Sequence, residues 1–219
     1  MDKSIPIVKL VSLGDSGVGK TQFLQVINDA RADDAPPLEM LPKAVPTIGV
    51  DFLVSVWTIN EHRFRIQMWD TAGSERYRAM ATTQYLRGCE IVLLFFDITS
   101  ASSFEHVKTV WLDMLNEHRK THGFENVTAV LVGNKCDLHE ARVLSTDEAE
   151  RFARQNDMLY IESTAYRKST VIAVVQSAME NVSRLHITNG CLADRSLVAA
   201  KEKLELQKHE RRGTGGCCK

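Results

Sequence analysis

The chain has 219 residues, of which 44% are hydrophobic and 25% are charged, enough for one well-cored domain with an appendage. Its 27 Lys and Arg residues are balanced by 28 Asp and Glu residues, so charge gives no reason to expect nucleic-acid binding. No apolar run approaches the roughly 20 residues of a membrane span, and the N-terminus lacks the long apolar stretch of a signal peptide. Five cysteines without disulfide or zinc spacing favour a reducing, cytoplasmic compartment.

Apolar, strand-like runs alternate with helix-like runs from Ile5 to about Leu185. The expected strands are Ile5–Leu13, Val50–Ile59, Arg63–Trp69, Glu90–Asp97, Val127–Val132 and Met158–Glu162. Only residues 60–62 separate the second strand from the third, which predicts an antiparallel hairpin. Segments of helical length join the other strands. We therefore predict a three-layer α/β fold, with a six-stranded, mostly parallel sheet and helices on both faces.

Two segments depart from this alternation. Residues 30–45 are rich in proline and poor in packing residues, which predicts a mobile loop. Beyond His186 the chain becomes rich in glycine and charge, with too little apolar content for a second core. We therefore expect a globular domain at residues 1–186 and a flexible tail at 187–219.

Residues 14–21 match the phosphate-binding pattern G-x-x-x-x-G-K-[ST], and a helix-like run begins near Lys20. The glycines let the backbone wrap so that N–H groups face phosphate oxygens, and the helix N-terminus adds its positive end. Lys20 is expected to reach the β- and γ-phosphates, and the Thr21 hydroxyl to hold Mg²⁺. The strand-loop-helix context makes a chance Gly-rich turn the weaker alternative, so we predict a nucleotide site on a P-loop NTPase fold. The expected contact residues are Gly14, Asp15, Ser16, Gly17, Val18, Gly19, Lys20, Thr21 and Gln22.

Three further motifs begin where expected strands end, at Asp70, Asn134 and Ser163. Ligands bind at this edge of an open α/β sheet. In Asn134-Lys135-Cys136-Asp137, the Asp137 carboxylate can accept hydrogen bonds from the ring N1–H and the exocyclic amine of guanine, which would select guanine over adenine. In isolation this tetrapeptide is better explained as a polar surface turn. Its place after a P-loop favours base binding.

Taken together, these motifs resemble those of a Ras-superfamily small GTPase, and most of all those of the Rab family. The resemblance covers roughly residues 5–185. It is carried by residues 14–21, 46–52, 69–73 and 134–137, with Rab-like features at 47–52 and 75–78. It implies a switch that binds GTP or GDP with Mg²⁺, hydrolyses GTP and acts in vesicle-mediated or intracellular protein transport. It also implies an exchange factor, an activating protein, effectors, a prenylation escort and a dissociation inhibitor as partners of a monomer.

The resemblance assigns roles to individual residues. Thr47 would coordinate Mg²⁺ while the γ-phosphate is present, Asp70 would hold the metal's water shell, and the Gly73 backbone N–H would contact the γ-phosphate. Loss of that phosphate would release the two loops that carry Thr47 and Gly73, so the chain would act as an on/off switch. Phe52 and Trp69 resemble the exposed aromatics that Rab effectors bind, with core packing as the alternative for Trp69.

Two departures from the family pattern concern the switch regions. Ser74 stands where the family carries the glutamine that orients the attacking water. Serine is too short to span the same distance, so we expect impaired intrinsic hydrolysis. The segment from Thr21 to Thr47 is several residues longer than usual, so the shape of this switch loop should be unusual.

Two other departures concern the base and the effectors. Thr164, Ala165 and Tyr166 replace the family's Ser-Ala-Lys turn. The Ala165 N–H could still bind the guanine carbonyl and Tyr166 could stack on the base, while the lysine's contribution is lost. Gln84 and Tyr85 replace a usual tyrosine pair, so effector choice should be idiosyncratic.

The C-terminus ends Gly-Gly-Cys217-Cys218-Lys219, which is not a C-a-a-X box. It resembles the double-cysteine ending on which Rabs carry two geranylgeranyl groups, and two chains would anchor stably. An unmodified tail with reactive thiols is the alternative. The resemblance implies a peripheral protein on the cytosolic face of an intracellular membrane, held by prenylated Cys217 and Cys218.

Two other functions stay open. A hydrolysis-deficient, constitutively GTP-bound membrane scaffold is favoured by Ser74, whereas the complete P-loop, Thr47 and Asp70 favour a working switch. A small nucleotide kinase could use the same P-loop, but the guanine-selecting motif at 134–137 would then have no purpose.

Overall fold

The six strands of the computed structural model form one sheet in the order β2-β3-β1-β4-β5-β6. The structure describes residues 5–28, 50–71, 85–122 and 127–188. The strands are β1 (Ile7–Gly14), β2 (Val50–Ile59), β3 (His62–Thr71), β4 (Ile91–Asp97), β5 (Thr128–Asn134) and β6 (Leu159–Ser163). Only β2 runs antiparallel, against β3, and the other neighbours are parallel. The predicted mostly parallel, six-stranded sheet is confirmed.

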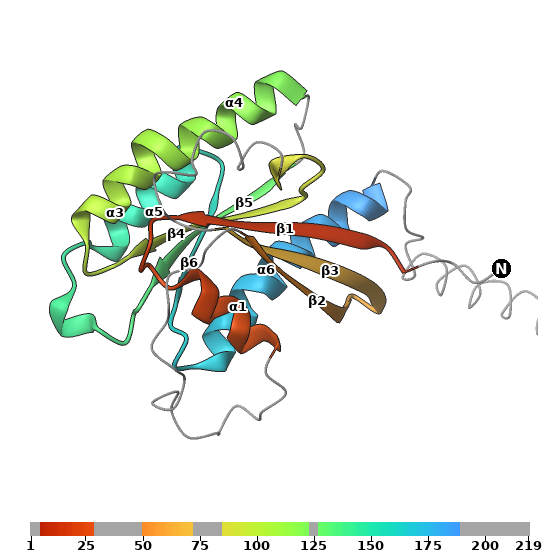
Figure 1. Ribbon diagram of the computed structural model, residues 1–219, viewed down its shortest axis with the longest axis horizontal. Helices are drawn as coiled ribbons and strands as arrows, with labels where there is room; N and C mark the ends of the chain where they lie inside the picture. The colour runs from red at the N-terminus through yellow and green to blue at the C-terminus, as the bar shows by residue number, and fades with distance from the viewer. Residues whose placement is uncertain (1–4, 29–49, 72–84, 123–126, 189–219) are drawn as a thin grey trace, which may run out of the picture. The chain divides into compact units, whose positions relative to one another are not determined.

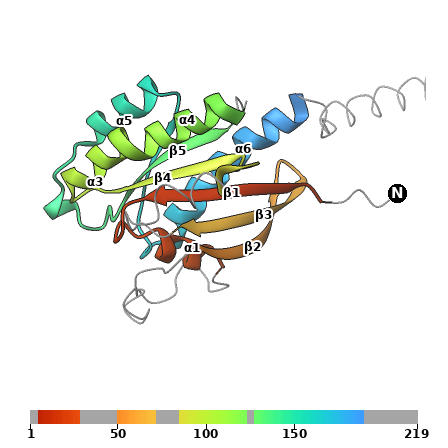
Figure 2. The same cartoon turned by 45° about the horizontal axis from the view of Figure 1, so that its top comes forward.

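Helices cover both faces of this sheet. They are α1 (Lys20–Asn28), α3 (Ala101–His106), the π-helical segment η3 (Val107–Trp111), α4 (Leu112–His122), the 3₁₀ turn η4 (His139–Ala141), α5 (Thr146–Gln155) and α6 (Lys168–Thr188). In Figures 1 and 2, α1 and α6 lie on one face, and α3, α4 and α5 lie on the other. The chain divides into the units Met1–Val182 and Ser183–Lys219. The sheet and helices α1, α3, α4 and α5 belong to the first unit, as does α6 up to Val182.

The alternation of side chains in β4 shows how the two cores form. Phe95 meets Phe23 of α1 edge to face, with ring centroids 5.0 Å apart. The next residue, Phe96, meets Phe104 of α3 on the opposite face, at 4.9 Å. Every residue of β4 is buried, as a strand covered on both faces requires. The continuous apolar run of this strand therefore supplies side chains to both hydrophobic layers.

Several element boundaries differ from the predicted ones. The β2–β3 hairpin turns on two residues rather than three, because Asn60 (φ 48°) and Glu61 (φ 65°) both take the left-handed conformation of a tight hairpin turn. His62 is instead the first residue of β3 and is buried. At their carboxyl ends, four strands run further than predicted: β1 to Gly14, β3 to Thr71, β5 to Asn134 and β6 to Ser163. The first residue of each of the four motifs therefore lies in a strand rather than after it.

No helix among the described residues is long and apolar enough to cross a membrane.

Candidate nucleotide-binding site

The turn between β1 and α1 is built around glycines that no other residue could replace without strain. Gly14 has a φ of 143°, and a Cβ there would lie 2.5 Å from the Phe95 carbonyl oxygen. Gly19 has a φ of 99°, and its Cβ would lie 2.4 Å from the Asn134 Nδ2 atom. The backbone is thus held tightly against β4 and β5, as a loop that presents its N–H groups to a phosphate requires.

Lys20 stands at the first position of α1, inside this turn, with 5% of its surface exposed. Its ammonium donates hydrogen bonds to the carbonyl oxygens of Gly14 and Asp15, each at 2.8 Å. Burial lowers the pKa of Lys20 to about 8, while the carboxylates of Asp70 and Asp15 act in the opposite direction. A buried cation with three N–H donors, two of them on neutral carbonyls, suits a phosphate oxygen as a further partner.

Two oxygen-bearing side chains meet beside Lys20. The Thr21 hydroxyl donates to the Asp70 carboxylate at 2.5 Å, and Asp70 is 2% exposed. Ser12 of β1 also donates to Asp70, at 3.4 Å, and to the Trp69 carbonyl at 3.2 Å. A hydroxyl and a carboxylate next to a phosphate loop are the hard oxygen donors that Mg²⁺ prefers, so these residues fit the metal that the sequence implies.

Asn134 joins the base-side motif to the P-loop. It is 2% exposed, and its Nδ2 donates to the Val18 carbonyl at 2.7 Å. Its Oδ1 atom is buried without a hydrogen-bond partner within the described residues. Buried polar atoms are normally paired, so this oxygen is a candidate contact for a bound ligand. Asp137 lies three residues further on, at the surface.

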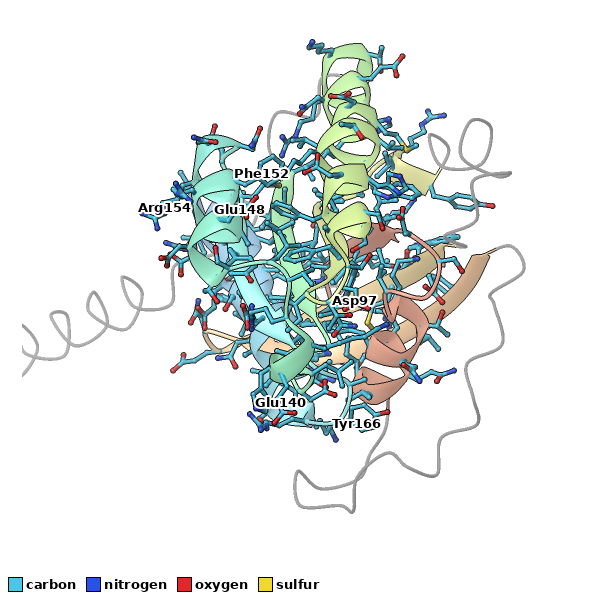
Figure 3. The ribbon with its side chains drawn as sticks, turned by 90° about the vertical axis from the view of Figure 1, so that its left-hand side faces the viewer. Asp97, Glu140, Glu148, Phe152, Arg154 and Tyr166 are labelled. Atoms are coloured by element: carbon cyan, nitrogen blue, oxygen red, sulfur yellow. The ribbon has the colours of Figure 1, made fainter. Side chains whose placement is uncertain are left out.

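A second turn packs beside this motif. The backbone N–H of Cys136 donates to the Ser163 carbonyl at 3.1 Å, which ties the two turns together. Thr164 and Ala165 are buried, and the Thr164 hydroxyl accepts from the Tyr166 N–H at 3.2 Å. The Tyr166 side chain is 56% exposed at the surface (Figure 3). All three residues predicted for the base turn therefore lie next to the Asn134 motif, at one edge of the sheet.

Asp97 is a site residue that the sequence analysis missed. It ends β4 and accepts an ion-pair contact from Lys135 Nζ at 2.7 Å. Burial alone would raise the pKa of Asp97, but hydrogen bonds from Lys135 and from Thr99 outweigh it and hold that pKa below its usual value. The signal was available, because Asp97 occupies the same sheet edge as the other strand-end motifs.

Glu162 stabilises the base turn from β6. Its carboxylate accepts two hydrogen bonds from Arg142, at 2.8 and 2.7 Å, and one each from Thr146 at 3.0 Å and Tyr160 at 2.8 Å. Burial would raise the pKa of Glu162, but these donors outweigh it, so the pKa lies below its ordinary value. The same environment raises the pKa of Tyr160, first through burial and then through the Glu162 carboxylate.

This network predicts an acid-sensitive stability. Because the pKa of Glu162 is lower in the folded chain, its contribution is present above the unfolded pKa and is lost as pH falls through the folded value. Glu162→Gln should lower the free energy of unfolding by about 1–3 kcal/mol at pH 7. It should also flatten the decline of that free energy as pH falls below 4.5, the ordinary pKa of glutamate. Urea unfolding at pH 7 and at lower pH measures both effects. In the matched control, Glu150→Gln, the lost partner is Arg154 on the exposed face of α5 (Figure 3), and the expected change is below about 0.5 kcal/mol. Equal losses in the two variants would contradict the prediction.

The aromatic residues predicted to be exposed behave differently from one another. Phe52 is 43% exposed, whereas Trp69 is half-buried and packs against the hydrophobic core. Their ring centroids lie 4.8 Å apart, and Tyr85 approaches Trp69 at 5.7 Å. The Lys9 ammonium lies 4.8 Å from the centre of the Trp69 ring. Trp69 thus combines core packing with a place in a surface aromatic group, whose role in effector binding stays a prediction.

Several predicted residues have no structural test here. Thr47, Gly73, Ser74 and Gln84 lie outside the described residues, as do Cys217 and Cys218 and most of the expected loop and tail. Gln22 lies half-buried in α1. The structure brings together the rest: Gly14 to Thr21, Asp70, Asn134, Lys135, Asp137, Thr164, Ala165 and Tyr166.

The sheet order, the glycine turn and the four strand-end motifs at one edge define a P-loop nucleotide-binding protein of the α/β class. The Ras family model matches residues 9–184, so the chain belongs to the Ras family.

Its relatives are of the Rab type. The chain is 37% identical over 165 residues to Ras-related protein Rab-1 of Theileria parva, covering 75% of this chain and 69% of that protein. It is 36% identical over 196 residues to GTP-binding protein ypt3 of Schizosaccharomyces pombe, covering 90% and 82%. It is 34% identical over 199 residues to Ras-related protein Rab-3C of Bos taurus, covering 91% and 81%. The chain is therefore a Ras-superfamily GTPase of the Rab type.

Proposed function

We propose that this chain is a switch of membrane traffic that binds GTP and GDP with Mg²⁺ and hydrolyses GTP slowly. The observation that carries the proposal is that Lys20, the Thr21–Asp70 pair and Asn134 meet around the turn between β1 and α1. These residues offer a buried cation for phosphates, hard oxygen ligands for the metal and a buried acceptor on the side of the base motif.

In this proposal different residues bind the phosphates, the metal and the base of the nucleotide. The P-loop N–H groups and Lys20 bind the phosphates, and Thr21, Thr47 and Asp70 hold the metal directly or through water. Bound Mg²⁺ neutralises charge on the phosphate oxygens. Asp137 selects guanine, and the Ala165 N–H binds its carbonyl. Thr47 binds Mg²⁺ only while the γ-phosphate is present, and the Gly73 N–H contacts that phosphate. Loss of the γ-phosphate therefore releases the two switch loops that carry Thr47 and Gly73.

The most direct experiment identifies the nucleotide retained by the purified full-length chain, followed by competition between GTP and ATP. We expect guanine nucleotide with Mg²⁺ and far weaker binding of ATP, because adenine leaves the Asp137 carboxylate unpaired. ATP that competes with GTP on equal terms would contradict the assignment of residues 134–137.

A constitutively GTP-bound scaffold is the second candidate, and Ser74 favours it. The same measurement separates the two functions. Retained GDP means that hydrolysis proceeds despite Ser74, whereas retained GTP supports the scaffold. Exchange factor, activating protein, effectors, prenylation escort and dissociation inhibitor belong to the switch proposal, with the aromatic group of Phe52, Trp69 and Tyr85 as the effector-facing surface.

We further propose that the chain acts as a monomer on the cytosolic face of an intracellular membrane, anchored through prenylated Cys217 and Cys218. The double replacement Cys217→Ser with Cys218→Ser should move most of the protein from the membrane fraction to the soluble fraction, because two prenyl chains supply the stable anchor. Cell fractionation measures the shift. Cys191→Ser, in the same expected tail, should stay on membranes. A double variant that remains membrane-bound would show that another anchor holds it.

A further inference from the structure

The helical segment after β4 contains an unusual turn that faces the P-loop. Between α3 and α4, residues Val107–Trp111 form a π-helix, closed by the Leu112 N–H on the Val107 carbonyl. Such turns are rare and are found mostly at functional sites. In an α-helix, residues five apart point about 140° away from each other. The wider turn brings His106 and Trp111 closer to a common face.

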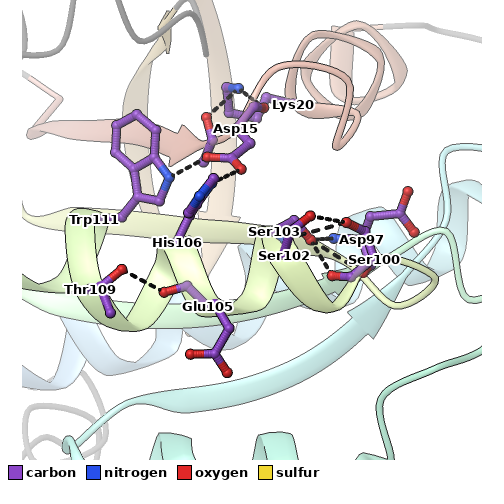
Figure 4. Close-up of polar contacts among 11 residues, drawn as sticks. Asp15, Lys20, Asp97, Ser100, Ser102, Ser103, Glu105, His106, Thr109 and Trp111 are labelled. Carbon is purple, nitrogen blue, oxygen red and sulfur yellow. Dashed lines mark hydrogen bonds and ion pairs between the residues drawn. The ribbon is translucent and has the colours of Figure 1, made fainter.

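Both side chains use that face to hold one residue, Asp15. The Trp111 Nε1–H donates to Asp15 Oδ1 at 2.9 Å, and His106 Nδ1 lies 2.5 Å from Asp15 Oδ2. Because a carboxylate only accepts, His106 must carry its proton on Nδ1. Figure 4 shows the imidazole and the indole converging on Asp15 from the same helical segment. We call these three residues the Asp15 latch.

Two of the three latch residues, Trp111 and Asp15, are largely shielded from water. Trp111 is 1% exposed and belongs to the hydrophobic core, and the Asp15 side chain is 17% exposed. The His106 side chain, at 38%, forms the outer side. Hydrogen bonds to a charged group in such a setting are stronger than neutral ones, so the carboxylate is firmly positioned.

Asp15 also touches the phosphate machinery through its backbone. Its carbonyl oxygen accepts from Lys20 Nζ at 2.8 Å (Figure 4), and its carboxylate acts to raise the pKa of that lysine. One residue therefore connects the π-turn, by its side chain, to the ammonium that is expected to bind phosphate. A shift of the carboxylate would move the first turn of the P-loop and Lys20 with it.

We propose that His106 and Trp111 are positioning residues that hold the P-loop, through Asp15, in the conformation that retains the phosphates of a bound nucleotide. The proposal rests on the proposed nucleotide site. It adds that nucleotide release is controlled from the helical segment 101–122. The control acts through two contacts with Asp15, one from His106, 91 positions away in the chain, and one from Trp111, 96 positions away.

The test is the rate at which the full-length chain, loaded with fluorescent GDP and Mg²⁺, releases it into excess unlabelled GDP. His106→Leu and Trp111→Phe each remove one donor and should speed GDP release about tenfold. A tenfold change corresponds to slightly less free energy than one charge-assisted hydrogen bond contributes. His106→Asn places an amide donor near the position of Nδ1 and should stay within about threefold of wild type. In an Asp15→Ala background, His106→Leu should have no further effect.

A matched core variant separates positioning from simple stability. Phe104 lies in the same helical segment, is fully buried against Phe96, and does not bond Asp15. Phe104→Leu should lower the melting temperature while leaving GDP release at the wild-type rate. Release that follows melting temperature across all variants, or that is unchanged in His106→Leu, would overturn the latch. A wild type that binds no GDP would instead contradict the proposed function.

Discussion

Replacing Asp137 with asparagine is expected to transfer base preference from guanine to xanthine. In the proposed complex the carboxylate would accept from both N1–H and the exocyclic amine of guanine, whereas the new amide would direct its own N–H₂ group at that amine. Two charge-assisted hydrogen bonds at about 1.5–3 kcal/mol each correspond to a loss of roughly 10²- to 10⁴-fold in GTP affinity. Xanthine carries a carbonyl at the same position, which the amide can serve as a donor. Titration of the variant with GTP and XTP measures both changes.

Asp97→Asn is the matched control for the change from guanine to xanthine preference that is expected of Asp137→Asn. It makes the same chemical change in a carboxylate that bonds Lys135 and Thr99 of the protein rather than the base. It should weaken GTP and XTP alike, because it loosens the motif without altering what Asp137 accepts. An Asp97→Asn variant that also gained XTP affinity would mean that loop geometry, and not the Asp137 carboxylate, selects the base.

The architecture could be predicted because it depends on local patterns. The run containing Phe95 and Phe96 is apolar throughout, and such a run fits only a strand covered on both faces. Once the strands alternate with helices, their carboxyl ends fall at one edge, so the P-loop and Asn134 had to be neighbours. The hydrogen bond between Asn134 and the Val18 carbonyl of the P-loop agrees with that expectation.

Contacts made by helix faces could not be predicted in the same way. His106 and Trp111 meet Asp15 only because a π-turn changes the angle between them, and no local pattern indicates that turn. The half-burial of Trp69 likewise depends on Tyr85 and Lys9, which come from other elements. The hairpin turn is one residue shorter than predicted because Glu61 adopts a positive φ. Gly, Asn or Asp is usually preferred at that position of the turn, so the sequence did not indicate it.

Ser74 should determine how slowly the chain hydrolyses GTP. Hydrolysis in this fold depends on a water held in line with the γ-phosphate while charges stabilise the transferring group. Lys20, Thr21 and Asp70 are in place for the charges, so GTP should bind and order the switches. Ser74 stands where the family resemblance places the glutamine that would hold the water. Ras with its glutamine turns over at only about 3–5 × 10⁻⁴ s⁻¹ alone, so we expect an intrinsic rate at or below that order.

Ser74→Gln should therefore raise the single-turnover rate of the GTP-loaded chain, because it restores a side chain long enough to reach the water. Ser74→Met, of similar length but without a hydrogen-bonding amide, should leave the rate at the wild-type level. An activating protein could supply a glutamine and an arginine in trans, which would speed the wild type without changing its intrinsic rate. A wild type that hydrolyses GTP clearly faster than Ser74→Gln would mean that another residue of this site already orients the water, and that Ser74 is part of a different solution to the same chemistry.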